Sequence, residues 1–294
     1  MSGPMESGSV MSGSDLSSPT TRLDVELVRR GLARSRPQAS TLLSNRRVQV
    51  EGAVVTKAST KVSQASEISV IEDLDDPDFV SRGGHKLAGA LADFAPLGLQ
   101  VSERRCLDAG ASTGGFTDVL LRAGAATVVA VDVGTEQLVS SLRDDPRVMV
   151  HEQTSLRGLR PDQVGGQVDV AVADLSFISL VKVLPELAAL TLETGDMVLM
   201  VKPQFEVGKS RLGRGGVVSD PALRLSAVEG VIEAAEALGW GCRAVTTSQL
   251  PGPSGNVEFF VWLAQGAGTC AAETIARVVT SAQRLGELDE SVGL

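Results

Sequence analysis

The stretch Cys106-Leu-Asp-Ala-Gly-Ala-Ser-Thr-Gly-Gly-Phe116 decides the fold that we expect for this chain. A short apolar segment leads directly into an acidic, glycine-rich turn, which is typical of a strand that delivers a cofactor-binding loop. Gly110, Gly114 and Gly115 can adopt positive φ angles, so the backbone can approach a ligand closely. Residues 116–122 then have the apolar spacing of a helix that packs on a sheet.

The residues around this loop separate three kinds of cofactor site. A triphosphate loop ends in Gly-Lys-Ser/Thr and a dinucleotide loop reads Gly-x-Gly-x-x-Gly, and neither order is present here. Asp108 before the glycines suits a cofactor with a positive sulfonium and an amino acid, which favours S-adenosylmethionine. The next apolar strand, 127–131, ends at Asp132 about 20 residues past the loop, where a carboxylate suits an adenosine ribose. A dehydrogenase loop and a glycine-rich turn without a ligand are the alternatives.

The composition indicates a globular protein. The 294 residues are 43% hydrophobic and can form one large domain or two smaller ones. No uncharged apolar run approaches the length of a membrane span, and residues 1–20 lack the apolar segment of an export signal, so we expect a soluble, cytoplasmic protein. Three scattered cysteines and two histidines predict neither a disulfide framework nor a metal site.

The formal net charge of −9, taken whole, argues against a nucleic-acid partner, but the charge is unevenly distributed. Residues 21–61 contain nine Lys and Arg against three acidic residues, a net charge of +6. Two short helical patterns, starting at Arg22 and at Ser35, are followed there by strand patterns at 48–50, 53–55 and 68–70.

This basic segment resembles the RNA-binding domain first known from small-subunit ribosomal protein S-four. The resemblance rests on Arg22-Leu-Asp24, Arg34-Ser-Arg36 and Val48-Gln-Val50-Glu-Gly52. It implies RNA contacts by arginines on the outer faces, namely Arg22, Arg34, Arg36, Arg46 and Arg47. A charged face that is merely solvated is the alternative.

We expect five segments along the chain. They are a disordered tail (1–20), an S-four-like RNA-binding domain (21–72), an acidic linker (73–80), a larger domain (81–265) and a tail with a helix (266–294). In the larger domain, apolar runs at 148–150, 168–173 and 197–201 alternate with helical segments such as 136–143 and 178–190. This alternation predicts an α/β fold with a Rossmann-like parallel sheet, joined to a small N-terminal α+β domain.

Four ionisable residues stand where such a sheet places its working groups, at the carboxyl ends of strands. Apolar runs end at Asp174, at Lys202 and near Glu258, and Lys86 begins the helix before the first strand. We expect them to converge beside the cofactor, where a lysine that follows a buried strand can act as a base. A strand-end charge that faces water is the alternative for each residue.

These four residues match the Lys-Asp-Lys-Glu set of the FtsJ-like ribose 2′-O-methyltransferases. Longer motifs resemble the TlyA family, and they are Ser81-Arg-Gly-Gly-His-Lys-Leu87, Leu107–Phe116, Ala173-Asp-Leu-Ser-Phe-Ile-Ser179, Val201-Lys-Pro-Gln-Phe-Glu-Val-Gly208 and Gly252-Pro-Ser-Gly-Asn-Val-Glu258. The resemblance covers residues 21–265. It implies an S-four domain joined to an FtsJ-like, S-adenosylmethionine-dependent domain that methylates cytidine ribose in rRNA, in ribosomal subunits or ribosomes. Some members of the family have been called haemolysins.

The resemblance also implies roles for individual residues. Lys202 would be the base, with Asp174 and Glu258 holding it and Lys86 in place, and no metal is needed. The implied cofactor site comprises Asp108, Gly110, Ser112, Thr113, Gly114, Gly115, Phe116, Asp132, Val133, Thr154, Ser155 and Asp174. Two positions depart from the family: Ser155 replaces the usual Asn, and Thr135 stands where an aromatic residue is common.

Two other classes of function compete with this interpretation. One is a non-enzymatic RNA-binding protein with a degenerate methyltransferase domain, against which the four complete catalytic positions argue. The other is a membrane-active haemolysin, for which the sequence offers neither a span nor a basic amphipathic helix rich in large apolar residues.

Overall fold

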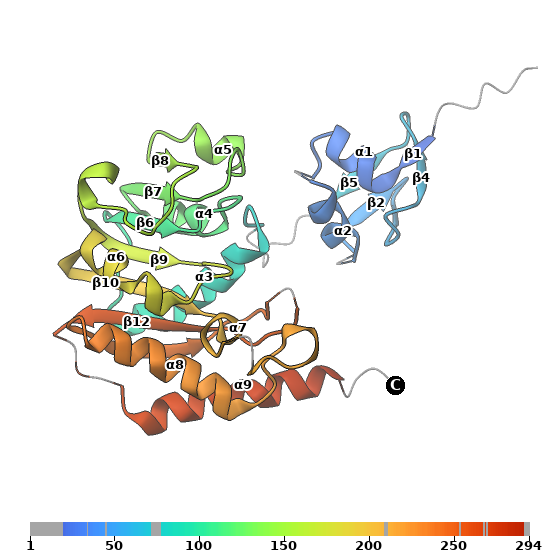
Figure 1. Cartoon of the computed structure of the whole chain (residues 1–294). Helices are drawn as coiled ribbons and strands as arrows, with labels where there is room; N and C mark the ends of the chain where they lie inside the picture. Colours follow the sequence, from blue (N-terminus) through green and yellow to red (C-terminus); the bar gives the residue numbers. More distant parts are fainter. Residues whose placement is uncertain are drawn as a thin grey trace, which may run out of the picture. The chain divides into compact units, whose positions relative to one another are not determined.

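A computed structural model describes residues 20–33, 35–44, 46–71, 78–208, 211–252, 254–266, 268 and 270–290, without the side chains of 37, 214 and 283–290. The chain divides into two compact units, Met1–Pro77 and Asp78–Leu294. Figure 1 labels their helices and strands. Most of the predicted N-terminal tail and of the predicted linker lies outside the described residues.

Within the described part of the chain, the larger unit is built on a seven-stranded sheet. Its strands are β6 Arg105–Ala109, β7 Thr127–Val131, β8 Val148–His151, β9 Val168–Ala173, β10 Thr191–Val201, β11 Trp240–Thr247 and β12 Phe259–Gln265. Its α-helices are α3 Arg82–Phe94, α4 Gly115–Arg122, α5 Ser140–Arg143, α6 Leu184–Leu190, α7 Pro203–Glu206, α8 Pro221–Glu236 and α9 Ala272–Glu290. Short 3-10 turns are η1 Ala95–Leu97, η2 Pro161–Val164, η3 Leu180–Lys182 and η5 Arg214–Gly216.

The strand order is β11-β12-β10-β9-β6-β7-β8. Neighbours from β10 to β8 are parallel, whereas β12 runs antiparallel to both β10 and β11. The chain proceeds from β6 outward to β7 and β8 and then returns to β9 on the other side of β6. Ligands of open α/β sheets bind at the carboxyl ends of the strands at such a reversal. The predicted Rossmann-like α/β sheet is confirmed.

The register of the parallel strands brings three strand ends together. Ala109 of β6 pairs with Val131 of β7 on one side and with Ala173 of β9 on the other. The residues that follow these three partners are Gly110, Asp132 and Asp174. One edge of the sheet therefore collects the glycine loop and two carboxylates that are far apart in sequence.

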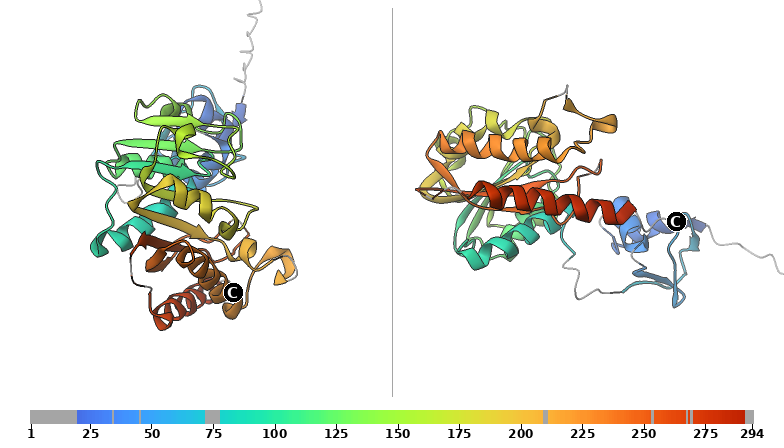
Figure 2. Two further views of the ribbon diagram at one scale, coloured as in Figure 1. Left: turned by 60° about the vertical axis from the view of Figure 1, so that its left-hand side comes forward. Right: turned by 90° about the horizontal axis from the view of Figure 1, so that it is seen from below.

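Two hydrophobic clusters cover the two faces of the sheet. One includes Leu87 and Phe94 of α3 and Leu120 of α4, and the other includes Leu187 of α6 and Val231 of α8. Helices α8 and α9 contact each other and β11, and the views in Figures 1 and 2 show the two long helices side by side. Both faces are thus buried, as expected for a parallel sheet.

The helix predicted over 136–143 is wrong in its first half, because only Ser140–Arg143 is helical. Glu136 has a φ of 52°, in the left-handed region. The backbone N–H groups of residues 136–138 donate to the carboxylate of Glu152. Because these N–H groups bind the Glu152 side chain, residues 136–138 form a turn, and the helix begins only at Ser140. The helix predicted over 178–190 is likewise divided into η3 and α6.

The smaller unit contains two helices and two small antiparallel sheets among its described residues. Its elements are β1 Thr20–Arg22, α1 Leu23–Arg29, α2 Arg36–Ser44, β2 Val48–Val50, β3 Ala53–Val54, β4 Lys61–Ser63 and β5 Ile68–Val70. β2 pairs with β3 and β5, and β1 pairs with β4. The core includes Leu23, Leu27 and Leu43 from the helices. The sequence did not predict β1 and β4, because three residues are too few to show an alternating pattern.

A buried acidic residue connects the two helices of the smaller unit. Asp24 is 2% exposed, and its carboxylate accepts hydrogen bonds from Arg22 Nε at 2.9 Å and from Arg36 Nη2 at 2.8 Å. Glu26 is fully buried and is likewise paired with two arginines. The hydrogen bond from Arg22, helped by Arg36, lowers the pKa of Asp24 to about 2, against the opposite effect of burial.

We predict that Asp24→Asn destabilises the smaller unit near neutral pH and that this difference disappears in acid. The pKa of Asp24 is lower in the folded than in the unfolded chain, so the ionised group stabilises the fold above about pH 4 and this contribution is lost as the pH falls toward 2. Urea unfolding of the unit, followed by its NMR signals from pH 7 to 2, measures this. The matched control is Glu67→Gln, at an exposed acid of the same unit. An Asp24→Asn difference that stays constant down to pH 2 would contradict the prediction.

Candidate functional site

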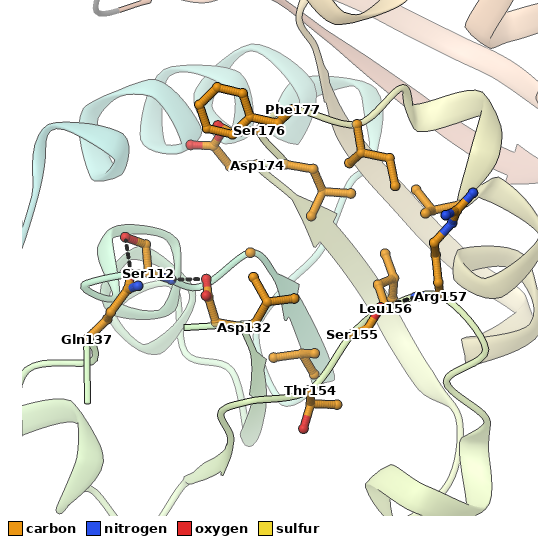
Figure 3. Close-up of a pocket in the computed structure, with 16 residues that line it drawn as sticks. Ser112, Asp132, Gln137, Thr154, Ser155, Leu156, Arg157, Asp174, Ser176 and Phe177 are labelled. Carbon is orange, nitrogen blue, oxygen red and sulfur yellow. Dashed lines mark hydrogen bonds between the residues drawn. The ribbon is translucent and has the colours of Figure 1, made fainter. Parts of the chain in front are cut away.

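A cavity of about 440 Å³ opens at the carboxyl ends of β6, β7 and β9, where the strand order reverses. This volume lies in the range of pockets that bind small organic ligands. Figure 3 shows the residues that line it. Seven of the predicted cofactor residues are among them, namely Gly110, Ser112, Asp132, Val133, Thr154, Ser155 and Asp174.

The glycine loop owes its path to two of its glycines. Gly110 has a φ of 89°, and a Cβ there would lie 2.7 Å from the carbonyl oxygen of Asp174. Gly114 has a φ of 102° and precedes α4. Gly115 does not use this freedom, because it is the first residue of α4, and it lacks a Cβ where it packs closely on the backbone of Gly84. The loop is therefore fixed both by backbone conformation and by close packing.

The carboxylate of Asp132 is held in place by two backbone N–H groups, one from the glycine loop and one from the turn after β7. Its Oδ2 accepts a hydrogen bond from the N–H of Ser112 at 2.8 Å, and its Oδ1 accepts one from the N–H of Gly134 at 2.7 Å. Ser112 Oγ lies 3.2 Å from Gln137 Oε1, and Figure 3 shows the three side chains together at one side of the cavity. Each carboxylate oxygen keeps a further lone pair for a hydroxyl group of a ligand.

Five predicted cofactor residues do not line this cavity: Asp108, Thr113, Gly114, Gly115 and Phe116. Phe116 is 3% exposed and belongs to the cluster on the α3 and α4 face, with its ring 6.1 Å from that of Phe260. The carbonyl of Thr113 accepts a hydrogen bond from Val139. Residues close together in the sequence therefore have different surroundings: Gly110 and Ser112 line the cavity, whereas Phe116 lies in α4 and faces the core.

Asp108 is fully buried below the loop, and its Oδ2 accepts a hydrogen bond from Thr117 Oγ1 at 2.7 Å. Its Oδ1 has no hydrogen-bond partner among the described residues. Burial raises the pKa of Asp108 to about 7, although the bond from Thr117 opposes this. The carboxyl therefore supports the loop from within the protein.

The predicted catalytic residues form two ion pairs at the same edge. Lys202 Nζ lies 2.6 Å from Asp174 Oδ1 in an ion pair, and Lys202 donates a hydrogen bond of 3.0 Å to Ser176 Oγ. Lys86 Nζ lies 2.5 Å from Glu258 Oε2, and both of these side chains are buried. Asp174 lines the cavity, so the first pair stands at its wall.

Glu258 reaches this edge in a way that the sequence did not predict. It was expected near the end of an apolar run, whereas it precedes the strand β12. Because β12 is antiparallel to β10 and pairs Val201 with Phe259, Glu258 and Lys202 both lie one position beyond that pair. Gln204 Nε2 donates to Glu258 Oε1 at 3.5 Å, a long contact.

Sequence reasoning missed several residues of the cavity wall, among them Gln137, Leu175 and Phe177. Phe177 is 92% exposed, has a φ of 65°, and lies with its ring centre 5.5 Å from that of Phe205. An exposed aromatic residue with a strained backbone beside a cavity is a functional candidate. The motif Ala173–Ser179 could have indicated Phe177, because it places an aromatic residue in the loop that follows a strand end.

The five arginines predicted to bind RNA are not equivalent. Arg22 and Arg36 both pair with the buried carboxylate of α1. Arg47 donates a hydrogen bond of 3.0 Å to a backbone carbonyl beyond β5, and Arg46 is exposed. Arg34 lies outside the described residues. Arginines at the surface of this unit therefore stabilise its fold through contacts within the unit, besides making its surface positive.

Of the two positions that depart from the family, Ser155 lines the cavity and Thr135 does not. The N–H of Arg157 donates to Ser155 Oγ at 3.1 Å. In the part of the chain that the structure describes, no three His, Cys, Asp or Glu side chains are grouped to hold a metal ion. None of the described helices is both long and apolar enough to cross a membrane.

Comparison with known proteins finds relatives over most of the chain. Residues 79–265 match the family described as FtsJ-like methyltransferase, and residues 21–68 match the S4 domain. The 16S/23S rRNA (cytidine-2′-O)-methyltransferase TlyA of Mycobacterium tuberculosis is 56% identical over 242 residues, covering 82% of this chain and 89% of the relative. Hemolysin A of Brachyspira hyodysenteriae is 35% identical, covering 81% and 97%. The solved structure of a candidate hemolysin from Streptococcus thermophilus has a TM-score of 0.73 at 36% identity, covering 94% of this chain and 100% of that one.

We predict that Asp108→Asn makes the larger unit less sensitive to pH between 4 and 8. The pKa of Asp108 is raised in the folded chain, so folding favours the protonated carboxyl, and stability falls as the pH rises from the ordinary value of an aspartate through about 7. Asparagine has the same shape without the charge. Thermal unfolding of both proteins at pH 5 and pH 8 measures this, with the exposed Asp162→Asn as control. Equal pH dependence in wild type and Asp108→Asn would show that Asp108 ionises freely.

Proposed function

The chain belongs to the FtsJ-like methyltransferase family and carries an S4 domain, and we propose that it transfers a methyl group from S-adenosylmethionine to a cytidine 2′-hydroxyl in ribosomal RNA. The TlyA protein of Mycobacterium tuberculosis, at 56% identity, is named for this reaction. For this chain we propose an rRNA substrate in ribosomal subunits or ribosomes, which would make the cytoplasm the place of action.

One observation carries the proposal: Asp174 belongs both to the cavity wall and to the ion pair with Lys202. A cofactor pocket and a basic side chain are thereby joined at one strand end. Transfer to a hydroxyl group needs this combination, because the acceptor must lose its proton where the methyl donor is bound.

The residues of the cavity fit S-adenosylmethionine. Asp132 offers two fixed carboxylate oxygens for ribose hydroxyl groups, and Val133 and Leu175 supply apolar wall. The bare backbone at Gly110 leaves room that a Cβ would fill. When bound, S-adenosylmethionine supplies an electrophilic methyl group on a positive sulfur.

Lys202 is the residue that we assign to take the proton of the 2′-hydroxyl. A hydroxyl group is a poor nucleophile near neutral pH, so a base in contact with it accelerates its attack. At rest Lys202 is an ammonium paired with Asp174, so it first releases a proton to solvent, and the neutral amine then takes the proton of the 2′-hydroxyl as its oxygen attacks the methyl group. Asp174 then stabilises the ammonium that forms, and Ser176 orients it through their hydrogen bond. The buried pair Lys86 and Glu258 joins α3 to the residue before β12 at the same edge; α3 begins at Arg82, so Lys86 lies one turn inside the helix and does not begin it as the sequence predicted.

The surroundings of the site suit a single-stranded RNA substrate. Phe177 presents an almost fully exposed ring beside the cavity, and unstacked RNA bases stack on such side chains. The S4 domain adds a segment whose net charge is positive, which attracts phosphates.

We predict that Asp132→Ala weakens S-adenosylmethionine binding at least about tenfold, because two charge-assisted hydrogen bonds are lost. Isothermal calorimetry measures the affinity, and circular dichroism checks the fold. Asp162→Ala, at an exposed aspartate, should bind as wild type does. Unchanged affinity in folded Asp132→Ala would remove Asp132 from the cofactor site.

We predict that Lys202→Arg and Lys202→Ala both lower the rate of methyl transfer about 10²-fold or more, the effect of removing a positioned base. Arginine keeps the charge but cannot give up its proton in a protein. The measurement is single-turnover methyl transfer to separated ribosomal subunits, with 2′-O-methylation mapped along each rRNA.

Affinity for S-adenosylmethionine, measured by calorimetry, should be retained in both variants and serves as the control. A Lys202→Arg protein with about half of the wild-type rate would overturn the general-base role and leave Lys202 an electrostatic one. Wild-type protein that methylates no rRNA position in either subunit would overturn the proposed function itself.

A further inference from the structure

Glu206, the last residue of α7, connects the two chain segments that carry the proposed base and its acidic partner. Its Oε2 accepts a hydrogen bond of 2.6 Å from Ser179 Oγ, and its Oε1 accepts one of 2.8 Å from the N–H of Leu180. Helix α7 begins directly after Lys202, and the loop with Ser179 begins at Asp174. Both oxygens of one carboxylate therefore bind one segment to the other.

The bridged segments are 174–180, which follows β9, and 202–206, which follows β10. Besides those of Glu206, the polar and ring contacts between these described segments are the ion pair and hydrogen bond of Lys202 and the ring contact between Phe177 and Phe205. Those contacts involve either the reacting lysine or a side chain that is 92% exposed. The two hydrogen bonds of Glu206 involve neither, so they can hold the segments in place while the lysine exchanges its proton.

Glu206 is unsuited to reacting itself. It is absent from the cavity wall, and both of its oxygens are engaged with the protein. The side chain is half-buried, and burial raises the pKa of its carboxyl while the hydrogen bonds oppose this. Withdrawing a carboxylate from water is unfavourable unless fixed donors replace the water, and here they do.

We propose that Glu206 is a positioning residue for methyl transfer: it clamps the loop 174–180 to α7 and so keeps Lys202 in contact with Asp174 and Ser176. This inference rests on the proposed function, because it concerns the same reaction. A displacement of about 1 Å at a reacting group can cost about 10²-fold in rate, so two hydrogen bonds at this place have a large effect.

The test compares Glu206→Ala with Glu206→Gln in steady-state methyl transfer to ribosomal subunits. Alanine removes both acceptors, and we expect kcat to fall at least about tenfold, with KM for RNA and affinity for S-adenosylmethionine within about twofold of wild type. Glutamine can still accept from Leu180 and can donate to Ser179, so it should restore kcat to within about threefold. Glu193→Ala, at an exposed glutamate of β10, is the control for loss of one negative charge.

Hydrogen exchange supplies a second measurement that needs no activity. In Glu206→Ala, faster exchange should be confined to peptides that cover 174–184 and 202–208. Wild-type kcat in Glu206→Ala would overturn the inference. So would a loss of kcat accompanied by weaker cofactor binding and faster exchange throughout the unit, since Glu206 would then be a general stability residue. A wild-type protein without activity would instead refute the proposed function, and the exchange result would still show whether the clamp exists.

Discussion

The parallel pairing of β6 with β9 is the constraint on which the site depends. It places Ala109 beside Ala173, so that Gly110 and Asp174 follow side by side. The carbonyl of Asp174 then comes so close to Gly110 that a Cβ would not fit between the two strand ends. A register shift of one residue would turn Asp174 to the other face of the sheet and separate the cavity from the ion pair with Lys202.

The sequence could predict the residues at the ends of strands, because the end of an apolar run shows where a strand leaves the sheet and this does not depend on which strands lie beside it. Asp132, Asp174 and Lys202 were found in this way, and the structure brings all three to one edge. The sequence pattern does not show whether a strand runs parallel or antiparallel to its neighbours. Glu258 precedes β12, and only the antiparallel pairing explains why it lies next to Lys202.

Contacts between segments that are distant in sequence could not be predicted. Phe116 follows the glycine loop directly, yet its helix turns it into the core toward Phe260. Glu152 shortens a predicted helix by accepting the N–H groups of a turn some fifteen residues earlier. Phe177 has a positive φ, which no apolar pattern reveals. In the first two cases the decisive partner is brought near by the fold, and the local sequence pattern contains no information about it.

The double pairing of Asp24 has a consequence for how this chain can vary. Arg22 and Arg36 supply surface charge and at the same time neutralise a carboxylate that is enclosed by protein. If RNA binds as proposed, a phosphate that contacts either guanidinium competes with Asp24 for it, so the same two side chains would contribute to RNA affinity and to the stability of the small unit. Substitution of Arg22 or Arg36 would then change both properties. Arg46 is exposed and is not among the described arginines that pair with Asp24 or Glu26, so its substitution would change RNA affinity without breaking a buried ion pair.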